Sequence, residues 1–226
     1  MYQRYIRRVS VAQIWMLISA LTVLTGCRYA VPAAPTPSLA ATLRVISRES
    51  TSSSDVTQAE LHQRALQLPR LKTRAECPRA SGRQVAPAYG DASGDGPVYA
   101  VDLGPDGISY FSFPPAAGSL FSGSEWSGAK VLWIIAPTYR GPVRIRGGRL
   151  DGPAAVRFNK GLDNGLDPTS ELWIDAAAAG SSVDWRNQGS YTRLQSPGCY
   201  AYQVDGRGFS EIIVFEAKAQ PAPSRN

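Results

Sequence analysis

The chain has 226 residues, of which 43% are hydrophobic and 19% are charged, and this length is enough for one domain with a buried core. Lysine and arginine together number 24 against 18 acidic residues, which gives a formal net charge of +6. The basic residues are dispersed along the chain, so the charge does not predict a nucleic-acid partner. Since the sequence has one histidine and three cysteines, catalytic triads and zinc sites of the usual His/Cys kind are not predicted either.

The first 26 residues have the layout of a bacterial signal peptide, which has no place in the mature fold. The mostly apolar stretch Val11–Leu24 has 14 residues, fewer than the roughly 20 that a membrane-spanning helix needs. It follows a basic start that contains Arg4, Arg7 and Arg8. Removal of these three arginines leaves 21 basic against 18 acidic residues, a net charge of +3.

The residues that close this stretch, Leu24-Thr25-Gly26-Cys27, resemble the lipobox of bacterial lipoproteins. The resemblance implies that residues 1–26 are removed and that Cys27 carries a lipid. The chain would then be anchored to a membrane face outside the cytoplasm, at the cell surface or in the periplasm. Two alternatives remain open: an ordinary signal peptide, or an uncleaved anchor in which Cys27 plays no part.

Residues 27–57 are predicted to form a flexible tether, because a Pro/Ala-rich segment and then a Ser/Thr-rich one bury too little apolar surface to fold. A short helix is expected from Val56 to Leu66, with Asp55 as its N-cap and Pro69 beyond its end. His62 lies in this lead-in and is expected to face solvent. The folded domain is expected to cover residues 58–218, followed by a disordered tail at 219–226.

From Pro97 to Lys218 the sequence consists of short apolar runs separated by Gly, Pro, Asn and Asp. These runs are rich in β-branched and aromatic residues, which is typical of strands. Eight strands are predicted: 98–101, 108–113, 129–135, 143–146, 155–158, 171–174, 200–204 and 211–215. Arg144 and Arg146 alternate with apolar residues and are expected on a solvated strand face. Eight strands in this length indicate a single β-sandwich.

The last two runs flank Asp205-Gly206-Arg207-Gly208, a turn sequence that predicts a hairpin. This hairpin resembles the closing hairpin of immunoglobulin-like β-sandwiches in bacterial surface proteins. More narrowly, segments between residues 66 and 217 are similar to uncharacterised bacterial secreted proteins and lipoproteins, among them Lys130-Val131-Leu132-Trp133 and Pro197-Gly198-Cys199-Tyr200. The resemblance implies one all-β, immunoglobulin-like domain and carries no catalytic residues.

Two cysteines remain if Cys27 is lipidated, namely Cys77 and Cys199. In an oxidising compartment they are the pair available for an intramolecular disulfide. Such a bond would join the start of the folded region to the penultimate strand. The alternative is two free thiols.

Enzymatic activity is not expected, since the sequence has no Gly-x-Ser-x-Gly elbow and no phosphate-binding glycine loop before a helix. A carboxylate-dependent envelope glycosidase is kept as the enzyme alternative, because paired carboxylates suffice for glycoside hydrolysis. The carboxylates available are Asp102, Asp106, Glu125, Asp151, Glu171 and Asp184. Most of them stand where turns favour aspartate.

No cofactor or metal is expected. One weak calcium candidate is the loop from Asp91 to Gly96, where oxygen-bearing side chains recur at alternate positions before a glycine. Its ligands would be Asp91, Ser93, Asp95 and Asp102. Serine at the third position and a strand after the loop argue instead for solvated turns.

Aromatic residues suggest a binding role. Trp133 and Trp173 lie within apolar strands and are expected in the core, whereas Trp126 and Trp185 stand among polar residues. Together with Tyr191 they are candidates to stack on an envelope glycan or to grip a protein partner. The first hypothesis is therefore a non-catalytic binding module of the cell envelope. A structural envelope protein without a discrete ligand is the alternative, and packed rather than exposed rings would favour it.

Overall fold

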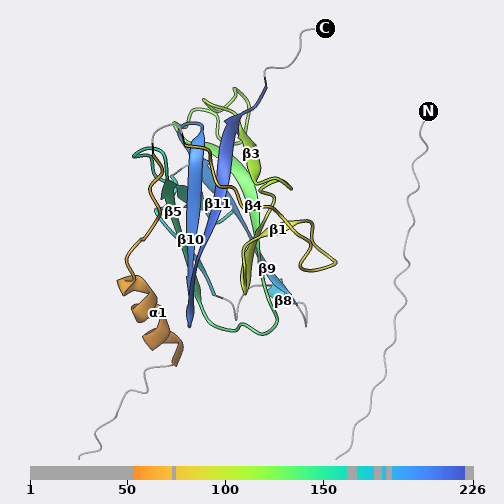
Figure 1. Cartoon of the computed structure of the whole chain (residues 1–226), viewed down its shortest axis with the longest axis vertical. Helices are drawn as coiled ribbons and strands as arrows, with labels where there is room; N and C mark the ends of the chain where they lie inside the picture. Colours follow the sequence, from red (N-terminus) through yellow and green to blue (C-terminus); the bar gives the residue numbers. More distant parts are fainter. Residues whose placement is uncertain (1–52, 73–74, 162–166, 176–179, 182–184, 222–226) are drawn as a thin grey trace, which may run out of the picture. The chain divides into compact units, whose positions relative to one another are not determined.

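The computed structural model describes residues 53–72, 75–161, 167–175, 180–181 and 185–221. The expected signal peptide, Cys27 and most of the expected tether lie outside this range. The described part is almost entirely β-structure, with two sheets and a short helix beside them (Figure 1). Among the described residues, no helix has the length and hydrophobicity to cross a membrane.

The first sheet, sheet A, is antiparallel throughout. Its longest strands are β4 (Ser127–Ile135) and β9 (Arg186–Leu194), which pair along their whole length. In spatial order the path of the sheet is β1 (Ala92–Ser93), β2 (Val98–Val101), β4, β9 and β6 (Arg157–Asn159). A further short strand, β8 (Gly180–Ser181), also pairs with β9.

The second sheet, sheet B, contains the closing hairpin. In spatial order it consists of β3 (Ile108–Phe111), β11 (Phe209–Ala219), β10 (Gly198–Gly206), β5 (Val143–Arg149) and β7 (Leu172–Ile174). The pairing of β3 with β11 is parallel and the others are antiparallel. The predicted hairpin is confirmed as β10 and β11, joined by Arg207 and Gly208.

A single core lies between the facing sides of the two sheets. Alternate residues of each strand point into it, as a pleated strand requires. The Trp133 ring of β4 meets the Tyr202 ring of β10 edge-on, with centroids 5.1 Å apart. The Tyr202 hydroxyl and the Thr192 hydroxyl of β9 are 2.7 Å apart, a hydrogen bond across the two sheets. The arrangement is therefore sandwich-like, and the all-β prediction is confirmed.

Strand β9 is central to sheet A but was not among the eight predicted strands. Its inward residues are largely polar: Arg186, Gln188, Ser190 and Thr192 share the side that ends at buried Leu194. Hydrogen bonds to the core satisfy some of them, as when Ser190 Oγ accepts from Trp133 Nε1 at 2.9 Å. Because strand prediction relies on apolar alternation, a strand whose inner side is polar escapes it. Strands β1 and β8, of two residues each, were also missed.

The helix α1 runs from Ser53 to Gln63 rather than from Val56 to Leu66. It therefore begins inside the expected tether, and its last turn buries Leu61, which is 1% exposed. The chain from residue 64 to residue 71 then crosses the outer side of sheet B without regular structure, and we call it the strap. Leu68 and Leu71 of the strap pack against Leu150 and Ala201.

The expectation that Arg144 and Arg146 face solvent is wrong. They are 8% and 9% exposed, because the end of α1 and the strap cover the outer side of β5. Arg144 donates to the carbonyls of Leu61 and His62, and Arg146 donates to the carbonyl of Ala65. Each also pairs with a carboxylate, Arg144 with Glu171 at 2.6 Å and Arg146 with Asp205 at 2.8 Å.

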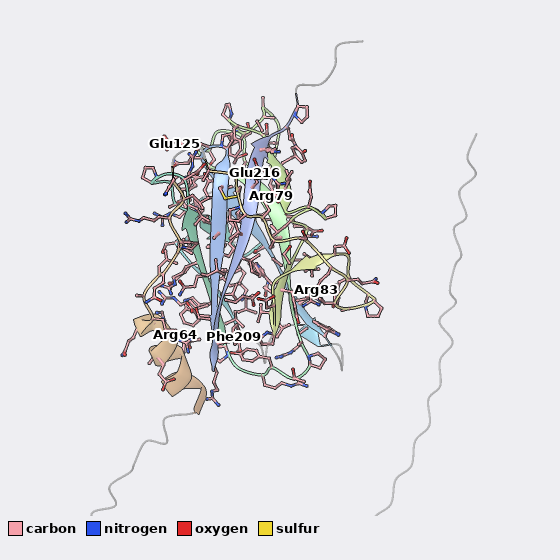
Figure 2. The ribbon with its side chains drawn as sticks, viewed as in Figure 1. Arg64, Arg79, Arg83, Glu125, Phe209 and Glu216 are labelled. Carbon is pink, nitrogen blue, oxygen red and sulfur yellow. A yellow bond between two sulfur atoms is a disulfide. The ribbon has the colours of Figure 1, made fainter. Side chains whose placement is uncertain are left out.

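The structure contains the predicted disulfide between Cys77 and Cys199, with Cα atoms 5.5 Å apart. It joins the segment after the strap to the start of β10. Nearby, Arg79 pairs with Glu216 of β11 at 2.5 Å, as Figure 2 shows beside the yellow sulfur bond. At the other end of the hairpin, Arg64 of the strap donates to the carbonyl of Phe209 at 2.5 Å (Figure 2).

Candidate functional site

The outer side of sheet A is where the aromatic residues singled out from the sequence emerge. On β4 the residues at 128, 130, 132 and 134 point outward, because Val131, Trp133 and Ile135 point into the core. On β9 the outward positions are 187, 189, 191 and 193, which pair with those of β4. Two loops pack on the outer side of sheet A. Residues 83–91 cover one end of it and residues 112–126 cover the other. Arg83 and Glu125 mark their separation in Figure 2.

What we call the Trp185 cluster consists of Tyr89 from the first loop, Tyr99 from β2 and Trp185, which immediately precedes β9. The ring centroids of Tyr99 and Trp185 are 5.9 Å apart, and both rings are half-buried. Asn187 donates its amide to the Tyr89 hydroxyl at 2.9 Å, and the Arg83 guanidinium lies 5.7 Å from the Tyr99 ring. Beneath them, Ala86, Ala92, Val101 and Ile134 form a small buried core of their own.

The Trp126 cluster consists of Phe121 and Trp126 from the second loop and Tyr191 from β9. Tyr191 meets Phe121 edge-on at 5.3 Å, and the Arg157 guanidinium lies 5.8 Å from the Trp126 ring. Beneath Phe121 lies Arg193, fully buried, with its guanidinium 3.8 Å from the centre of that ring.

Hydrogen bonds fix Arg193 in this position. Its guanidinium donates to the Asn159 side chain at 2.6 Å, to the Trp126 carbonyl at 2.6 Å and to the Ser124 hydroxyl at 2.9 Å. Burial lowers the pKa of Arg193. An arginine keeps its charge even so, because its ordinary pKa lies far above neutral pH. Arg193 thus ties the 112–126 loop to β9 and β6.

Between the two clusters the sheet lies open, with Lys130, Leu132 and Gly189 as the outward residues. Lys130 is exposed, and Leu132 and Gly189 are half-buried and paired with each other. A Cβ built on Gly189 meets no atom within 4 Å, whereas one built on Gly128 lies 2.2 Å from the Phe121 ring. Gly128 is therefore required by packing, and Gly189 is not.

Trp126, Trp185 and Tyr191 thus share one side of sheet A but do not form one patch. At about 3.3 Å per residue, Trp185 and Tyr191 are separated by roughly 20 Å along β9. Trp133 lies in the core as expected, but the prediction for Trp173 is wrong. Trp173 is half-buried on the outer side of sheet B, 4.4 Å from the exposed His62 ring and 5.6 Å from the Arg144 guanidinium.

The carboxylates considered for glycoside hydrolysis are dispersed. Burial alone would raise the pKa of Glu171, but hydrogen bonds from Trp173 and Arg144 hold it below its ordinary value. Likewise the hydrogen bond and charge of Arg149 outweigh burial and lower the pKa of Asp151. Both groups are therefore ionised ion-pair partners, an arrangement that suits neither as a general acid. Asp102, Asp106 and Glu125 are exposed, and Asp184 lies outside the described residues.

The calcium candidate is not gathered into a ring of ligands. Ser93 is 1% exposed and lies in β1 opposite Ala100. Asp91 precedes this strand and Asp95 follows it, so the two carboxylates lie beyond its opposite ends. The amide nitrogens of Asp95 and Gly96 instead donate to the carboxylate of Glu211. Within the described ranges, no three His, Cys, Asp or Glu side chains are placed to share a metal ion.

Sequence reasoning missed Tyr89, Tyr99 and Gly189. Tyr99 was recognised as a strand residue, and its outward direction follows once Val98 and Ala100 are seen to be buried. Gly189 has a weak signal in the sequence, since it stands at the centre of a segment whose alternate residues are Asn187, Tyr191 and Arg193. Tyr89 joins the cluster only through the path of its loop, which the sequence does not specify.

Comparison with known proteins defines no family. No family model matches the chain, and no curated protein matches it. Among solved structures, a candidate lipoprotein from Bacillus anthracis has a TM-score of 0.41 and 10% identity, over 64% of this chain and 88% of that one. The CooA pilin subunit from enterotoxigenic Escherichia coli has a TM-score of 0.30 and 11% identity, over 56% of this chain and 100% of that one. Likeness at this level assigns neither a family nor a function.

Proposed function

We propose that this protein is a lipid-anchored protein of the bacterial cell envelope and that its domain is a non-catalytic binding module. The binding surface is the outer side of sheet A. The observation that supports this best is that Trp126, Trp185 and Tyr191, from different segments, emerge on the same side of one sheet. Half-buried rings beside polar side chains provide apolar contact and hydrogen bonding together, as binding surfaces do.

The anchor rests on the lipobox-like residues before Cys27. Cys27→Ser in the full chain removes the sulfur that would carry the lipid. We expect the wild-type protein to sediment with membranes and to be released by detergent, and the variant to stay in the soluble fraction. Equal sedimentation of both proteins would contradict lipid anchoring.

We also propose that the sandwich is immunoglobulin-like, because the sequence of its closing hairpin resembles that of immunoglobulin-like sandwiches. The disulfide, which joins β10 to the segment before the sandwich, is compatible with that class.

The binding role is tested by placing a bulky ring between the two clusters. Gly189→Trp fills space that is open in the structure, and Ile212→Trp adds the same ring to an exposed position of β11 in sheet B. We expect detergent-solubilised wild-type protein and Ile212→Trp to co-sediment saturably with washed insoluble envelope material. Gly189→Trp should bind at least tenfold more weakly. Equal binding by the two variants would rule out this side of sheet A as the site.

A structural envelope protein without a discrete ligand is the second candidate. The packing of the rings within each cluster favours it, because Trp185 rests on Tyr99 and Tyr191 on Phe121. It predicts no saturable binding in the same experiment, so the two candidates are separated by one measurement. A glycosidase would instead need a facing carboxylate pair in addition to a binding surface.

A further inference from the structure

Gly189, in the middle of β9, is the residue that points most directly to a bound ligand. A glycine in the middle of a strand weakens that strand, and it often marks a place where a ligand or another backbone approaches closely. Gly189 is the fourth of nine residues in β9, and its backbone is not left-handed. Since a Cβ there would meet no protein atom within 4 Å, neither conformation nor packing requires glycine. Close approach of another molecule to the backbone would explain why this position is a glycine.

The charge around Gly189 is positive. Lys130 lies diagonally across from it on β4 and is exposed, and Arg157 on β6 points to the same side. Arg83 stands at the Trp185 cluster. The outward positions of β2, β4, β6 and β9 carry no aspartate or glutamate: Tyr99, Val101, Gly128, Lys130, Leu132, Ile134, Arg157, Asn159, Asn187, Gly189, Tyr191 and Arg193. Acidic residues do occur in the flanking loops: Glu125 precedes Trp126, Asp91 follows Tyr89 by two positions, and the Asp167 carbonyl accepts from the Asn159 side chain.

The surface is the side of a sheet and not its edge. An extended peptide is usually bound at an edge, where free main-chain groups add it as another strand. The main-chain groups of β4 and β9 are paired with each other over nine residues and are not available. What this side offers is aromatic rings, the Asn187 amide, the Tyr191 hydroxyl and the cations Lys130, Arg157 and Arg83. A sugar ring, with an apolar side and a rim of hydroxyls, matches that set of groups.

We infer that the ligand of this surface is an acidic oligosaccharide that lies across Gly189, with its anionic groups toward Lys130 and Arg157 and a sugar ring against the Trp185 cluster or Tyr191. This inference rests on the proposed function, because it takes the outer side of sheet A to be the binding surface. The two clusters, roughly 20 Å apart along β9, limit the bound part to a few sugar rings.

Calorimetric titration of the full-length protein in detergent tests the ligand class. The probes are an oligogalacturonate and a maltooligosaccharide of equal length, each at low salt and at about 0.5 M salt, where exposed charges are strongly screened. We expect the acidic sugar to bind, the neutral sugar to bind at least tenfold more weakly, and the acidic sugar to weaken severalfold in high salt. Lys130→Ala should weaken binding of the acidic sugar severalfold. Replacement of Lys72, an exposed lysine immediately after the strap, by alanine should not change that binding.

Gly189→Trp should weaken binding of the acidic sugar at least tenfold, while Ile212→Trp should leave that binding unchanged. If a thermal melt shows that Gly189→Trp does not fold, Gly189→Thr is used instead. Threonine is favoured in strands, and its side chain would still occupy the space above residue 189. Binding that responds equally to Lys72→Ala and Lys130→Ala is nonspecific charge attraction and overturns the inference.

Failure of this inference and failure of the proposed function give different results. Binding of the neutral sugar as tightly as the acidic one, lost in Gly189→Trp, overturns the acidic ligand but keeps the binding surface. No binding of either sugar, with envelope binding that Gly189→Trp still abolishes, overturns the oligosaccharide and points to a protein partner. No dependence of any binding on Gly189 overturns both.

Discussion

The carboxylate of Glu211 joins the two sheets at one edge of the sandwich. It belongs to β11 of sheet B, and it accepts hydrogen bonds from the Asp95 and Gly96 amides in the turn that follows β1 of sheet A. Burial raises its pKa from 4.5 to about 7, and the negative charge of Asp95 adds to this. The two amides and the Arg83 guanidinium oppose the shift without cancelling it.

This shift predicts that the domain becomes less stable as the pH rises from about 4.5 to about 7. Over that range the folded protein holds a proton on Glu211 that the unfolded chain has already released, so folding is favoured at the acidic end. The loss in free energy of unfolding reaches up to about 3 kcal/mol above pH 7, at 1.36 kcal/mol per pKa unit. Urea denaturation at pH 5 and pH 8 measures it.

Glu211→Gln provides the control, because glutamine stays neutral at both pH values. We expect the difference in unfolding free energy between pH 5 and pH 8 to shrink markedly in this variant. A variant that keeps the full wild-type difference would show that other groups cause it.

Arg144 and Arg146 show which property of a single residue the sequence does not predict, namely its burial on the outer side of a strand. Alternation of arginine with Val143 and Ile145 correctly predicted a strand with one apolar side. The pattern is the same whether the other side faces water or is covered by another segment. Here the covering segment, residues 61–67, lies about 80 residues earlier in the chain, as the bond from Arg144 to the Leu61 carbonyl shows. Burial of the outer side therefore depends on tertiary contacts that local periodicity does not contain.

The strap is held to sheet B by side chains that bind its main chain. Gln203 of β10 accepts from the Gln67 amide at 2.6 Å and donates to the Ala65 carbonyl at 3.0 Å. It also donates to the fully buried Asp205 carboxylate at 3.0 Å and 3.1 Å. A single amide side chain thus imitates the pairing of a neighbouring strand, and for this reason the strap needs no regular structure to stay in place.

Gln203→Ala should destabilise the domain by about 2 kcal/mol, because it leaves the Gln67 amide without this acceptor and Asp205 without this donor. Gln67→Ala is the matched control, since the bond uses its main-chain nitrogen and its side chain is exposed. Urea denaturation compares the two variants, and hydrogen exchange at residues 65–67 reports the strap itself. Equal stability of both variants would mean that the hydrogen bonds of Gln203 do not stabilise the strap.

The elements of sheet A were predictable to different degrees. Strand β4 was recognised from Val131-Leu132-Trp133, which is apolar on both sides because loop 83–91 covers part of its outer side. Strand β9 was not recognised, although it contains Tyr191 and Trp185 lies immediately before it. Its polar inner side is stable because the partners of Ser190 and Thr192 are Trp133 and Tyr202, which come from other strands. The candidate residues could thus be named from the sequence, but the surface that they share required the register of β4 with β9.

At the scale of the whole molecule, the disulfide determines how far the N-terminal segment can separate from the sandwich. In the lipid-anchored protein that we propose, a pull on the anchor would reach the domain through α1 and the strap, which are attached by hydrogen bonds and a few apolar contacts. Beyond them the Cys77–Cys199 bond joins the chain covalently to β10, and the Ala80 amide then pairs with the Val214 carbonyl of β11. Peeling of the strap would therefore stop at Cys77 and leave the sandwich intact.

The same bond should dominate the stability of the domain. It joins residues 122 positions apart, and a cross-link over a loop of that length lowers the entropy of the unfolded chain by an amount worth up to about 4–5 kcal/mol. The double variant Cys77→Ser, Cys199→Ser should lose free energy of unfolding on this scale, and wild-type protein under reducing conditions should match it in urea denaturation. Since the loss arises in the unfolded chain, the denaturant slope of the double variant should rise as its unfolded state expands. A double variant as stable as the oxidised wild type would show that the two sheets and the strap hold the fold without help from the cross-link.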